Sequence, residues 1–361
     1  MNALSSKPLL PLLLLVGALG ASAGCDDAAD GTGGSASSST SATSGSTSTS
    51  SSSSTTGSTS VSSGTGGAPA TPTFVAQFDA AKGELAEGLF VKGQAAYVGL
   101  AGLGKIVKVA LPGGAVTDFG NIPAPPANSG FLLGIVVDAA DNVYVGFGGG
   151  PGAPVANGIY KIPAAGGAVT LPFTTNAEMN FPNGLYLDAS NDVYIADSGG
   201  AIFKMATANG AITKWKADPL LVGTDTSCMY AAPFAIGANG IVRIGDAFYV
   251  SNTNLGSIVK IPINGDGTAG AATVFAGPDC NTLGGIDGID VAPDGKTILG
   301  VINSRSEVVQ VDEAGKVTAV FTGKPLDNPA SLDVSGTDAF ITNSAFFDAM
   351  TPAPGLLVLP L

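Results

Sequence analysis

The stretch FPNGLYLDASNDVYIADSG, residues 181–199, contains two short apolar runs separated by turn-forming residues. The first run, Leu185–Leu187, directly follows the pair Asn183-Gly184, and the second is centred on Tyr194-Ile195. The residues between them, Ala189-Ser190-Asn191-Asp192, favour turns. Short apolar runs bounded in this way predict two adjacent β-strands joined by a hairpin turn.

The same pattern recurs along the chain from Thr73 to Leu361. Each copy continues with a third and a fourth strand-like run, such as AIFKMAT and AITKW after the stretch above. A small residue opens each copy, at intervals of about 43–56 residues: Gly88, Gly134, Gly184, Gly240, Gly288 and Ser331. Four β-rich segments at this period predict an all-β fold, a six-bladed β-propeller with four strands per blade.

The last copy ends at Leu361 after its third strand, so its fourth strand must come from elsewhere. The run TFVAQF, Thr73–Phe78, precedes the first copy and has a strand pattern. We predict that this N-terminal strand completes the last blade and closes the ring, which removes open sheet edges. Residues 73–361 then form one domain, which we expect to be a monomer.

The first 24 residues are typical of an export signal. The apolar run Leu9–Val16 is too short to span a bilayer, and small residues precede Cys25. This segment resembles a bacterial lipoprotein signal peptide with Cys25 as the lipidated residue; the alternative is ordinary cleavage after Ala23, which gives a secreted soluble protein. Residues 25–72 are rich in Ser, Thr and Gly and predict a disordered tether. We therefore expect an exported protein of the bacterial cell envelope, attached to a membrane only through its N-terminal lipid.

The composition excludes several classes of function. The net charge is −13 with 15 Lys and Arg residues, which argues against nucleic acid or an anionic lipid surface as a partner. Histidine is absent, so His-based triads, His general bases and His-ligated zinc sites are excluded. Chemistry in this chain must rest on carboxylates, amides, hydroxyls or a bound hard cation.

Cysteine usage predicts one disulfide. The chain has 3 Cys, and assigning Cys25 to a lipid leaves an even pair in an oxidising compartment. Cys228 and Cys280 lie in equivalent loops of successive repeats. We predict a Cys228–Cys280 disulfide that makes one wall of the binding face rigid.

The residues just before the small opening residues predict a metal site. They are Glu87, Leu133, Asn183, Asn239, Asp287 and Ala330. In a propeller all inner strands begin on one face around the central channel, so these positions converge. Four of the six offer oxygen, which suits Ca²⁺ with its 6–8 oxygen ligands, although another divalent cation is possible. The alternative is turn chemistry, because Asn-Gly and Asp-Gly are common turn pairs.

At these residues the chain resembles the SMP-30/gluconolactonase/LRE-like family, which places Glu before the first inner strand, Asn before the third and fourth, and Asp before the fifth. The resemblance implies a Ca²⁺-dependent hydrolase of a lactone or related ester. Glu87, Asn183, Asn239 and Asp287 would hold the metal, and Asp287 would be the catalytic base that activates water. Two departures argue against a sugar-acid lactone: Phe181 replaces a substrate-binding Arg of the family motif, and its Asp is missing between Asn183 and Gly184.

Two functions therefore remain open. We favour the metal-dependent hydrolase of a small-molecule lactone or ester. The alternative is a non-catalytic propeller that binds a ligand or an envelope partner and uses any cation structurally.

Further polar residues lie where second strands end on the same face: Asp197, Asn252, Asn303 and Asn343. They are candidates for the pocket rim. The alternative interpretation is a set of local turns in which Asp or Asn side chains bond the backbone.

Overall fold

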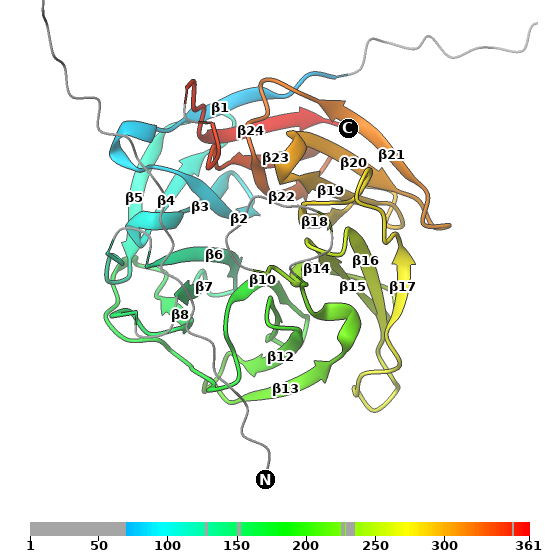
Figure 1. The fold of residues 1–361 in the computed structure, drawn as a ribbon. Coiled ribbons are helices and arrows are strands. Elements are labelled where there is room, and N and C mark those ends of the chain that lie inside the picture. The colour runs from blue at the N-terminus through cyan, green and yellow to red at the C-terminus, as the bar shows by residue number, and fades with distance from the viewer. Residues whose placement is uncertain (1–69, 127–128, 150–152, 225–227, 229–234, 349) are drawn as a thin grey trace, which may run out of the picture. The chain divides into compact units, whose positions relative to one another are not determined.

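The computed structural model describes residues 70–126, 129–149, 153–224, 228, 235–348 and 350–361. The predicted signal peptide, Cys25 and the tether as far as residue 69 lie outside the described residues. The described strands form six sheets arranged around a central axis, and Figure 1 shows them as six blades in chain order. The predicted six-bladed β-propeller is confirmed.

Within each blade the strands run antiparallel from the axis outward. The inner strands are β2 (Ala86–Lys92), β6 (Gly130–Val137), β10 (Pro182–Leu187), β14 (Ala238–Ile244), β18 (Ile286–Val291) and β22 (Pro329–Ser335). The second strands are β3 (Ala95–Leu100), β7 (Val143–Gly149), β11 (Asp192–Asp197), β15 (Ala247–Asn252), β19 (Ile298–Ile302) and β23 (Asp338–Asn343). The third strands are β4 (Lys105–Ala110), β8 (Gly158–Ile162), β12 (Ala201–Ala206), β16 (Ser257–Pro262), β20 (Glu307–Val311) and β24 (Gly355–Pro360). The outer strands are β5 (Val116–Asn121), β13 (Ile212–Ala217), β17 (Thr273–Ala276), β21 (Val317–Thr322) and β1 (Thr73–Gln77).

Helical structure in the described part of the chain consists of four 3₁₀ segments of three residues each: η1 (Ala80–Lys82), η2 (Ala101–Leu103), η3 (Pro219–Leu221) and η4 (Asn303–Arg305). None of these helices has the length and apolar character that crossing a membrane would require.

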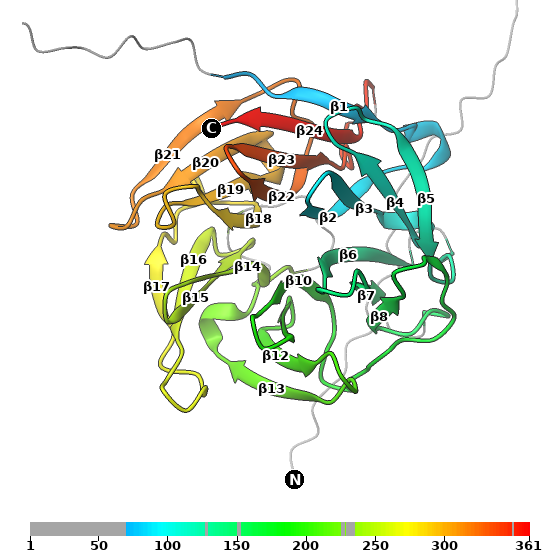
Figure 2. The same ribbon diagram turned by 180° about the vertical axis from the view of Figure 1, so that it is seen from behind.

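The ring closes as the sequence predicts. Strand β1 pairs antiparallel with β24, with Thr73 opposite Val358, and so completes blade 6. Figures 1 and 2 show this blue strand beside the red C-terminal strand. Each inner strand also packs against the inner strand of the next blade, including β22 against β2. The N-terminal strand therefore joins the two ends of the domain.

Blade 2 departs from the four-strand pattern. Its described sheet contains three strands, β6, β7 and β8. The segment expected to form its outer strand contributes only β9 (Gly167–Ala168), which pairs parallel with β5 of blade 1. Pro172 lies in this segment and has no N–H group to donate to a sheet ladder. The remaining contact with β8 is a single bridge between Ile159 and Thr174.

Hydrophobic contact between blades holds the ring together. One core cluster joins Tyr97 of blade 1 to Val145 of blade 2, and another joins Tyr194 of blade 3 to Phe248 of blade 4. Trp215 packs edge-on against Phe248, with ring centroids 5.4 Å apart. Because each blade buries its faces against its neighbours, a single blade has no complete core of its own.

All six inner strands are irregular at the same point. The pairing with the second strand is broken at the residue predicted to face the axis, as at Asn183 in blade 3 and at Asp287-Gly288 in blade 5. Such bulges redirect a side chain. None of the glycines that follow these positions has a positive φ. The Asn-Gly and Asp-Gly pairs therefore lie inside strands, and the turn interpretation is wrong.

These glycines allow the inner strands to approach one another closely. A Cβ atom on Gly184 would lie 2.1 Å from the carbonyl oxygen of Asn239 in the next blade. The same relation holds between Gly88 and Leu133, at 2.0 Å, and between Gly134 and Asn183, at 2.3 Å. Any side chain here would separate the blades, so glycine sets the diameter of the ring.

We predict that Gly184→Ala destabilises the protein by about 1–3 kcal/mol, because the added methyl group collides with the Asn239 carbonyl. Urea unfolding followed by the fluorescence of Trp215, the only Trp, measures this change.

Gly113→Ala is the matched control, because nothing lies within 4 Å of the added methyl group and the residue has no positive φ. Its free energy of unfolding should stay within about 0.5 kcal/mol of the wild-type value. Equal losses for the two variants would refute a packing role for Gly184.

Candidate functional site

The four predicted ligands lie at the heads of the inner strands of blades 1, 3, 4 and 5. All are buried, with exposed fractions of 7% for Glu87, 6% for Asn183, 4% for Asn239 and 7% for Asp287. Leu133 and Ala330 hold the equivalent positions in blades 2 and 6 and are also buried. The ring at the strand heads is therefore polar on four sides and apolar on two.

Electrostatic interaction and hydrogen bonding link three of the four side chains. The carboxyl groups of Glu87 and Asp287 repel each other although blade 6 separates their strands. The side chain of Asn239 donates a hydrogen bond to the Asp287 carboxylate. Asn183 occupies the equivalent position in the neighbouring blade, where Gly184 packs against the Asn239 carbonyl. The structure thus brings the predicted residues to one ring.

Hydroxyl groups orient the two amides. Asn183 Nδ2 donates to Ser198 Oγ at 3.3 Å, and Asn239 Nδ2 donates to Thr253 Oγ1 at 3.0 Å. Ser198 and Thr253 each directly follow the second strand of their blade. Because the amide nitrogens are held by these contacts, the amide oxygens are the atoms left to accept a bond or bind a cation.

The same hydroxyls connect one blade to the next. Ser198 Oγ donates to the carbonyl oxygen of Ala238 at 2.9 Å, and Thr253 Oγ1 donates to that of Ile286 at 2.7 Å. Ala238 and Ile286 immediately precede Asn239 and Asp287. Each hydroxyl therefore orients one ligand side chain and fixes the backbone beside the next ligand.

The two carboxyl groups lack compensating charge. Burial raises the pKa of Glu87 well above its usual range, and the nearby Asp287 charge raises it further. Burial raises the pKa of Asp287 to about 8, against the opposing hydrogen bond from Asn239. None of the ion pairs between described residues includes either group. Ionised, both carboxylates would be buried without a positive partner.

An orphaned oxygen atom shows that the site fits a hard cation. Glu87 Oε2 is buried and has no hydrogen-bond partner, an arrangement that costs free energy in a protein interior. The described residues contain no group of three or more His, Cys, Asp or Glu side chains suited to a metal. Two carboxylates and two amide oxygens, however, match the ligand chemistry of Ca²⁺. A cation here would satisfy the orphaned atom and neutralise the buried charge.

A second carboxyl pair was missed at the sequence level. Asp290 and Asp333 lie three residues after the ring positions of blades 5 and 6. Asp290 accepts a hydrogen bond from the Val334 N–H at 2.7 Å, and Asp333 accepts one from the Val91 N–H at 3.0 Å. Burial, with the charge of Asp290, raises the pKa of Asp333 to about 8. Their equal spacing from the ring positions was the available signal; structurally, they satisfy inner-strand N–H groups.

The four candidate rim residues are buried and bond to nearby backbone groups. Asp197 accepts from the N–H groups of Asn180 and Phe181, Asn252 donates to Leu220 O and Val222 O, Asn303 donates to Asn328 O, and Asn343 donates to Pro325 O and Ala353 O. Local bracing of loops accounts for these bonds. A role at the pocket rim stays a prediction.

Cys228 and Cys280 form a disulfide with their Cα atoms 4.9 Å apart. Cys228 lies in the loop that leads into β14, and Cys280 lies in the loop that leads into β18. The disulfide therefore ties together the two segments that precede Asn239 and Asp287.

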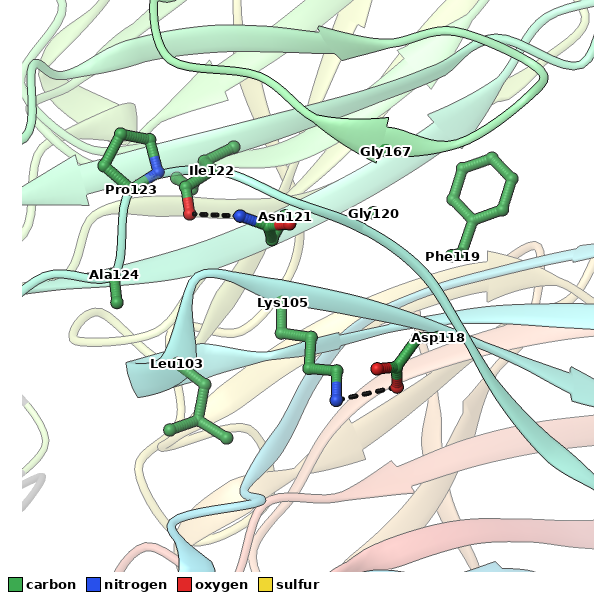
Figure 3. A pocket seen from close by; sticks show the side chains of 10 residues that line it. All are labelled: Leu103, Lys105, Asp118, Phe119, Gly120, Asn121, Ile122, Pro123, Ala124 and Gly167. Carbon is green, nitrogen blue, oxygen red and sulfur yellow. Dashed lines mark hydrogen bonds and ion pairs between the residues drawn. The ribbon is translucent and has the colours of Figure 1, made fainter.

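A separate pocket of about 440 Å³ lies at the outer part of blade 1. Figure 3 shows Lys105 and Asp118 facing each other there, and their charged atoms are 2.7 Å apart. None of the four candidate ligands lines this pocket. It is distinct from the ring site.

The raised pKa values predict a pH-dependent stability for the cation-free protein. Below the usual pKa of 3.8, Asp287 is protonated in both the folded and the unfolded states. Between pH 3.8 and about 8 the unfolded chain releases this proton while the folded protein retains it. The free energy of unfolding therefore falls across this window, by about 1.4 kcal/mol per pH unit for one such group.

Urea unfolding in a chelator at pH 5 and pH 8 tests this expectation. The wild type should be less stable at pH 8, and Asp287→Asn should show a smaller difference between the two pH values. Saturating Ca²⁺ should also reduce the difference, because it binds the ionised carboxylates. An identical pH dependence in the wild type and in Asp287→Asn would contradict the assignment.

We predict that Thr253→Val lowers Ca²⁺ affinity about tenfold, because it frees the Asn239 amide and the Ile286 carbonyl. Calorimetric titration of Ca²⁺ measures the effect. Ser344→Ala is the matched control: this buried hydroxyl also follows a second strand and donates to a backbone oxygen, of Asn328, but Ala330 provides no ligand in its blade. Similar losses in both variants would rule out a specific positioning role for Thr253.

Comparison with known proteins identifies the fold. No protein-family model matches the sequence, and neither does any curated protein. Among solved structures, a luciferin-regenerating enzyme shares 11% identity with a TM-score of 0.56, covering 77% of this chain and 92% of the other. The calcium-binding protein regucalcin from Agrobacterium tumefaciens shares 16% identity with a TM-score of 0.55, covering 76% and 90%.

A gluconolactonase from Xanthomonas campestris shares 17% identity with a TM-score of 0.55, covering 77% of this chain and 86% of the other. At such identities the likeness concerns the fold. The expected resemblance to SMP-30/gluconolactonase/LRE-like propellers is therefore confirmed at the level of fold: this chain has the six-bladed architecture that these proteins share.

Proposed function

We propose that this protein is a Ca²⁺-dependent hydrolase of a lactone or related ester. The observation that carries the proposal is the orphaned, buried Glu87 Oε2 in a ring of oxygen side chains. A buried acid without a partner is costly to stability. Such an arrangement is expected where a ligand supplies the missing interaction.

The residues in and around the ring would bind the cation or position the groups that bind it. Glu87, Asn183, Asn239 and Asp287 would hold the cation. Bound there, Ca²⁺ would polarise the carbonyl of a lactone and lower the pKa of a water molecule. Ser198 and Thr253 accept hydrogen bonds from the amide nitrogens of the two asparagines, which leaves the amide oxygens to bind the cation.

Asp287 is the candidate general base. Its carboxyl group lies in the ring beside Asn239, and next to the proposed cation it would be ionised and so have affinity for a proton. A base with such affinity can take the proton released as water adds to the carbonyl. Asp287 would then pass this proton to the ring oxygen of the lactone, which leaves as the hydroxyl group of a hydroxy acid, and the carboxylic acid that forms would release its own proton to solvent.

The likeness in fold supports the proposal. One structural neighbour is described as a calcium-binding protein and another as a gluconolactonase. These descriptions belong to those proteins. They make the combination of a divalent cation and lactone hydrolysis a reasonable proposal for a propeller with this ring of oxygen atoms.

Burial of the ring favours a second candidate function. All four side chains are less than a tenth exposed, which also suits a cation that only braces the inner strands. In that case the protein is a non-catalytic propeller that binds a ligand or an envelope partner. Metal binding alone does not separate the two functions, whereas hydrolysis does.

We predict saturable one-to-one Ca²⁺ binding by the chelator-treated full chain, measured by calorimetric titration. Asn239→Ala should abolish it, because the substitution removes a ligand and the hydrogen bond to Asp287. The absence of binding heat in the wild type, at protein concentrations that reveal millimolar sites, would exclude the metal.

Asp287→Asn should lower the rate of lactone hydrolysis at least a hundredfold while retaining the propeller fold, because the amide cannot act as a base. Hydrolysis of a panel of lactones, with circular dichroism for the fold, measures this. Ca²⁺ binding by the wild type without turnover of any lactone or ester would favour the structural cation.

A further inference from the structure

The residues two positions before the ring positions lie at the beginning of the inner strands, and we take them as the entrance to the site. They are Leu85, Phe131, Phe181, Gly237, Gly285 and Asn328. The apolar side chains on blades 1, 2 and 3 are half-buried. Blades 4 and 5 carry glycine at this position. The entrance therefore has apolar side chains on blades 1, 2 and 3, no side chain on blades 4 and 5, and the polar Asn328 on blade 6.

An aromatic contact extends the apolar side. Phe131 of blade 2 meets Phe346 of blade 6 edge-on, with ring centroids 6.1 Å apart. Blades 2 and 6 flank blade 1, whose ring residue is Glu87. Because both rings come from segments on the face where inner strands begin and second strands end, the contact crosses the head of blade 1 on the ligand side.

The segment that carries Phe346 is held in place by several bonds. It follows β23 and is drawn in red on the blade 1 side of blade 6 in Figures 1 and 2. The Phe347 N–H donates to Asn328 Oδ1 at 2.9 Å, and Lys324 Nζ contacts Asp348 at 2.9 Å. Ala345, just before Phe346, has a φ of 53°. A non-glycine residue keeps this left-handed conformation only where its surroundings impose it.

Phe181 completes the apolar side next to Asn183. Its ring lies against Gly148 of blade 2, where an added Cβ would come within 2.4 Å of the ring. The missing side chain at Gly148 makes room for Phe181. The aromatic ring is therefore accommodated by the neighbouring blade.

The nearby basic side chains are already engaged: Lys324 contacts Asp327 and Asp348, and Arg305 on the face of blade 5 is bonded in its own loop. Arg305 donates to the carbonyl oxygens of Thr282 and Cys280 and pairs with Glu307 at 2.9 Å. It holds the loop beside the disulfide. A charged substrate would therefore find aromatic rings on one side of the entrance and an arginine committed to loop structure on the other.

We infer that the ring site takes an uncharged lactone or ester with an apolar aryl or alkyl substituent, which rests against Phe131 and Phe346. The inference rests on the proposed function and specifies its substrate class. The carbonyl of such a compound would face the oxygen ring. Its apolar substituent would lose water against the two phenyl rings, which favours binding.

Binding of hydrolysis-resistant lactams tests the inference separately from turnover. Dihydroquinolinone, the lactam analogue of dihydrocoumarin, and gluconolactam are titrated calorimetrically into the Ca²⁺-supplied full chain. The aromatic lactam should bind more tightly than the sugar lactam. Phe131→Ala and Phe346→Ala should each weaken it about tenfold, with Ca²⁺ affinity unchanged as the test that the variants are folded.

Val274→Ala is the control, because Val274 is a 40% exposed apolar residue on the outer strand β17. Its affinity for the aromatic lactam should equal that of the wild type. If Phe346→Ala fails to fold, Phe346→Leu takes its place in the test. Because leucine keeps an apolar side chain, this variant should retain most of the affinity for the aromatic lactam.

The outcomes separate the inference from the proposed function. Lactam binding that depends on Phe131 and Phe346, in a protein that hydrolyses no lactone, supports the apolar site and excludes the proposed hydrolase function. The same lactam binding in a protein that gives no heat of Ca²⁺ binding also supports the apolar site, and it excludes the proposed metal-dependent hydrolase function. Tighter binding of gluconolactam, no binding of dihydroquinolinone, or equal affinity in the wild type and both phenylalanine variants overturns the inference, even where lactone hydrolysis is found.

Discussion

The close approach of the six inner strands is the constraint on which the rest of this structure depends. It requires glycine immediately after the ring position in five blades, because the carbonyl group of the next blade occupies the space of a side chain, as Asn239 does for Gly184. The accompanying bulges redirect the ring residues. Ring closure by β1 then fixes the last blade against the first. A site made of residues 200 positions apart, Glu87 and Asp287, exists only because of this packing.

The same packing creates an electrostatic problem in the interior. Glu87 and Asp287 are buried together, and Asp290 and Asp333 lie three residues further along two of the inner strands. The second pair has backbone N–H groups as partners. Glu87 Oε2 has none. The fold therefore tolerates four buried or half-buried carboxyl groups in different ways: the second pair is bonded to backbone N–H groups, whereas the ring pair includes an unpaired oxygen atom that a cation would satisfy.

The repeat in the sequence was sufficient to predict the propeller, its closure by Thr73–Phe78 and the residues at the strand heads, because period, turn residues and alternating patterns are local properties. Other features depend on contacts between distant residues. The close fit of Gly184 against Asn239 cannot be distinguished from a turn in a one-dimensional pattern. The roles of Ser198 and Thr253 follow from hydrogen bonds between blades. Pro172, in contrast, was a readable sign that blade 2 would lack a regular outer strand.

Polar and apolar residues lie on different sides of the ring site, and this distribution bears on the departures from the sugar-lactonase pattern. Asn239 and Asp287 lie in the neighbouring blades 4 and 5, which the Cys228–Cys280 disulfide joins, and Gly237 and Gly285 stand two positions before them. Phe131 and Phe346, from blades 2 and 6, meet at the head of blade 1, and Phe181 lies on blade 3 with its ring against Gly148 of blade 2. Under the proposed substrate class, a ligand would present its polar atoms to blades 4 and 5 and its apolar part to Phe131 of blade 2 and Phe346 of blade 6. Phe181, at the position where the sugar-lactonase pattern is expected to have an arginine, adds an aromatic ring that packs against blade 2. Phe346 lies outside the repeat pattern, and its contact with Phe131 becomes visible only in the folded chain.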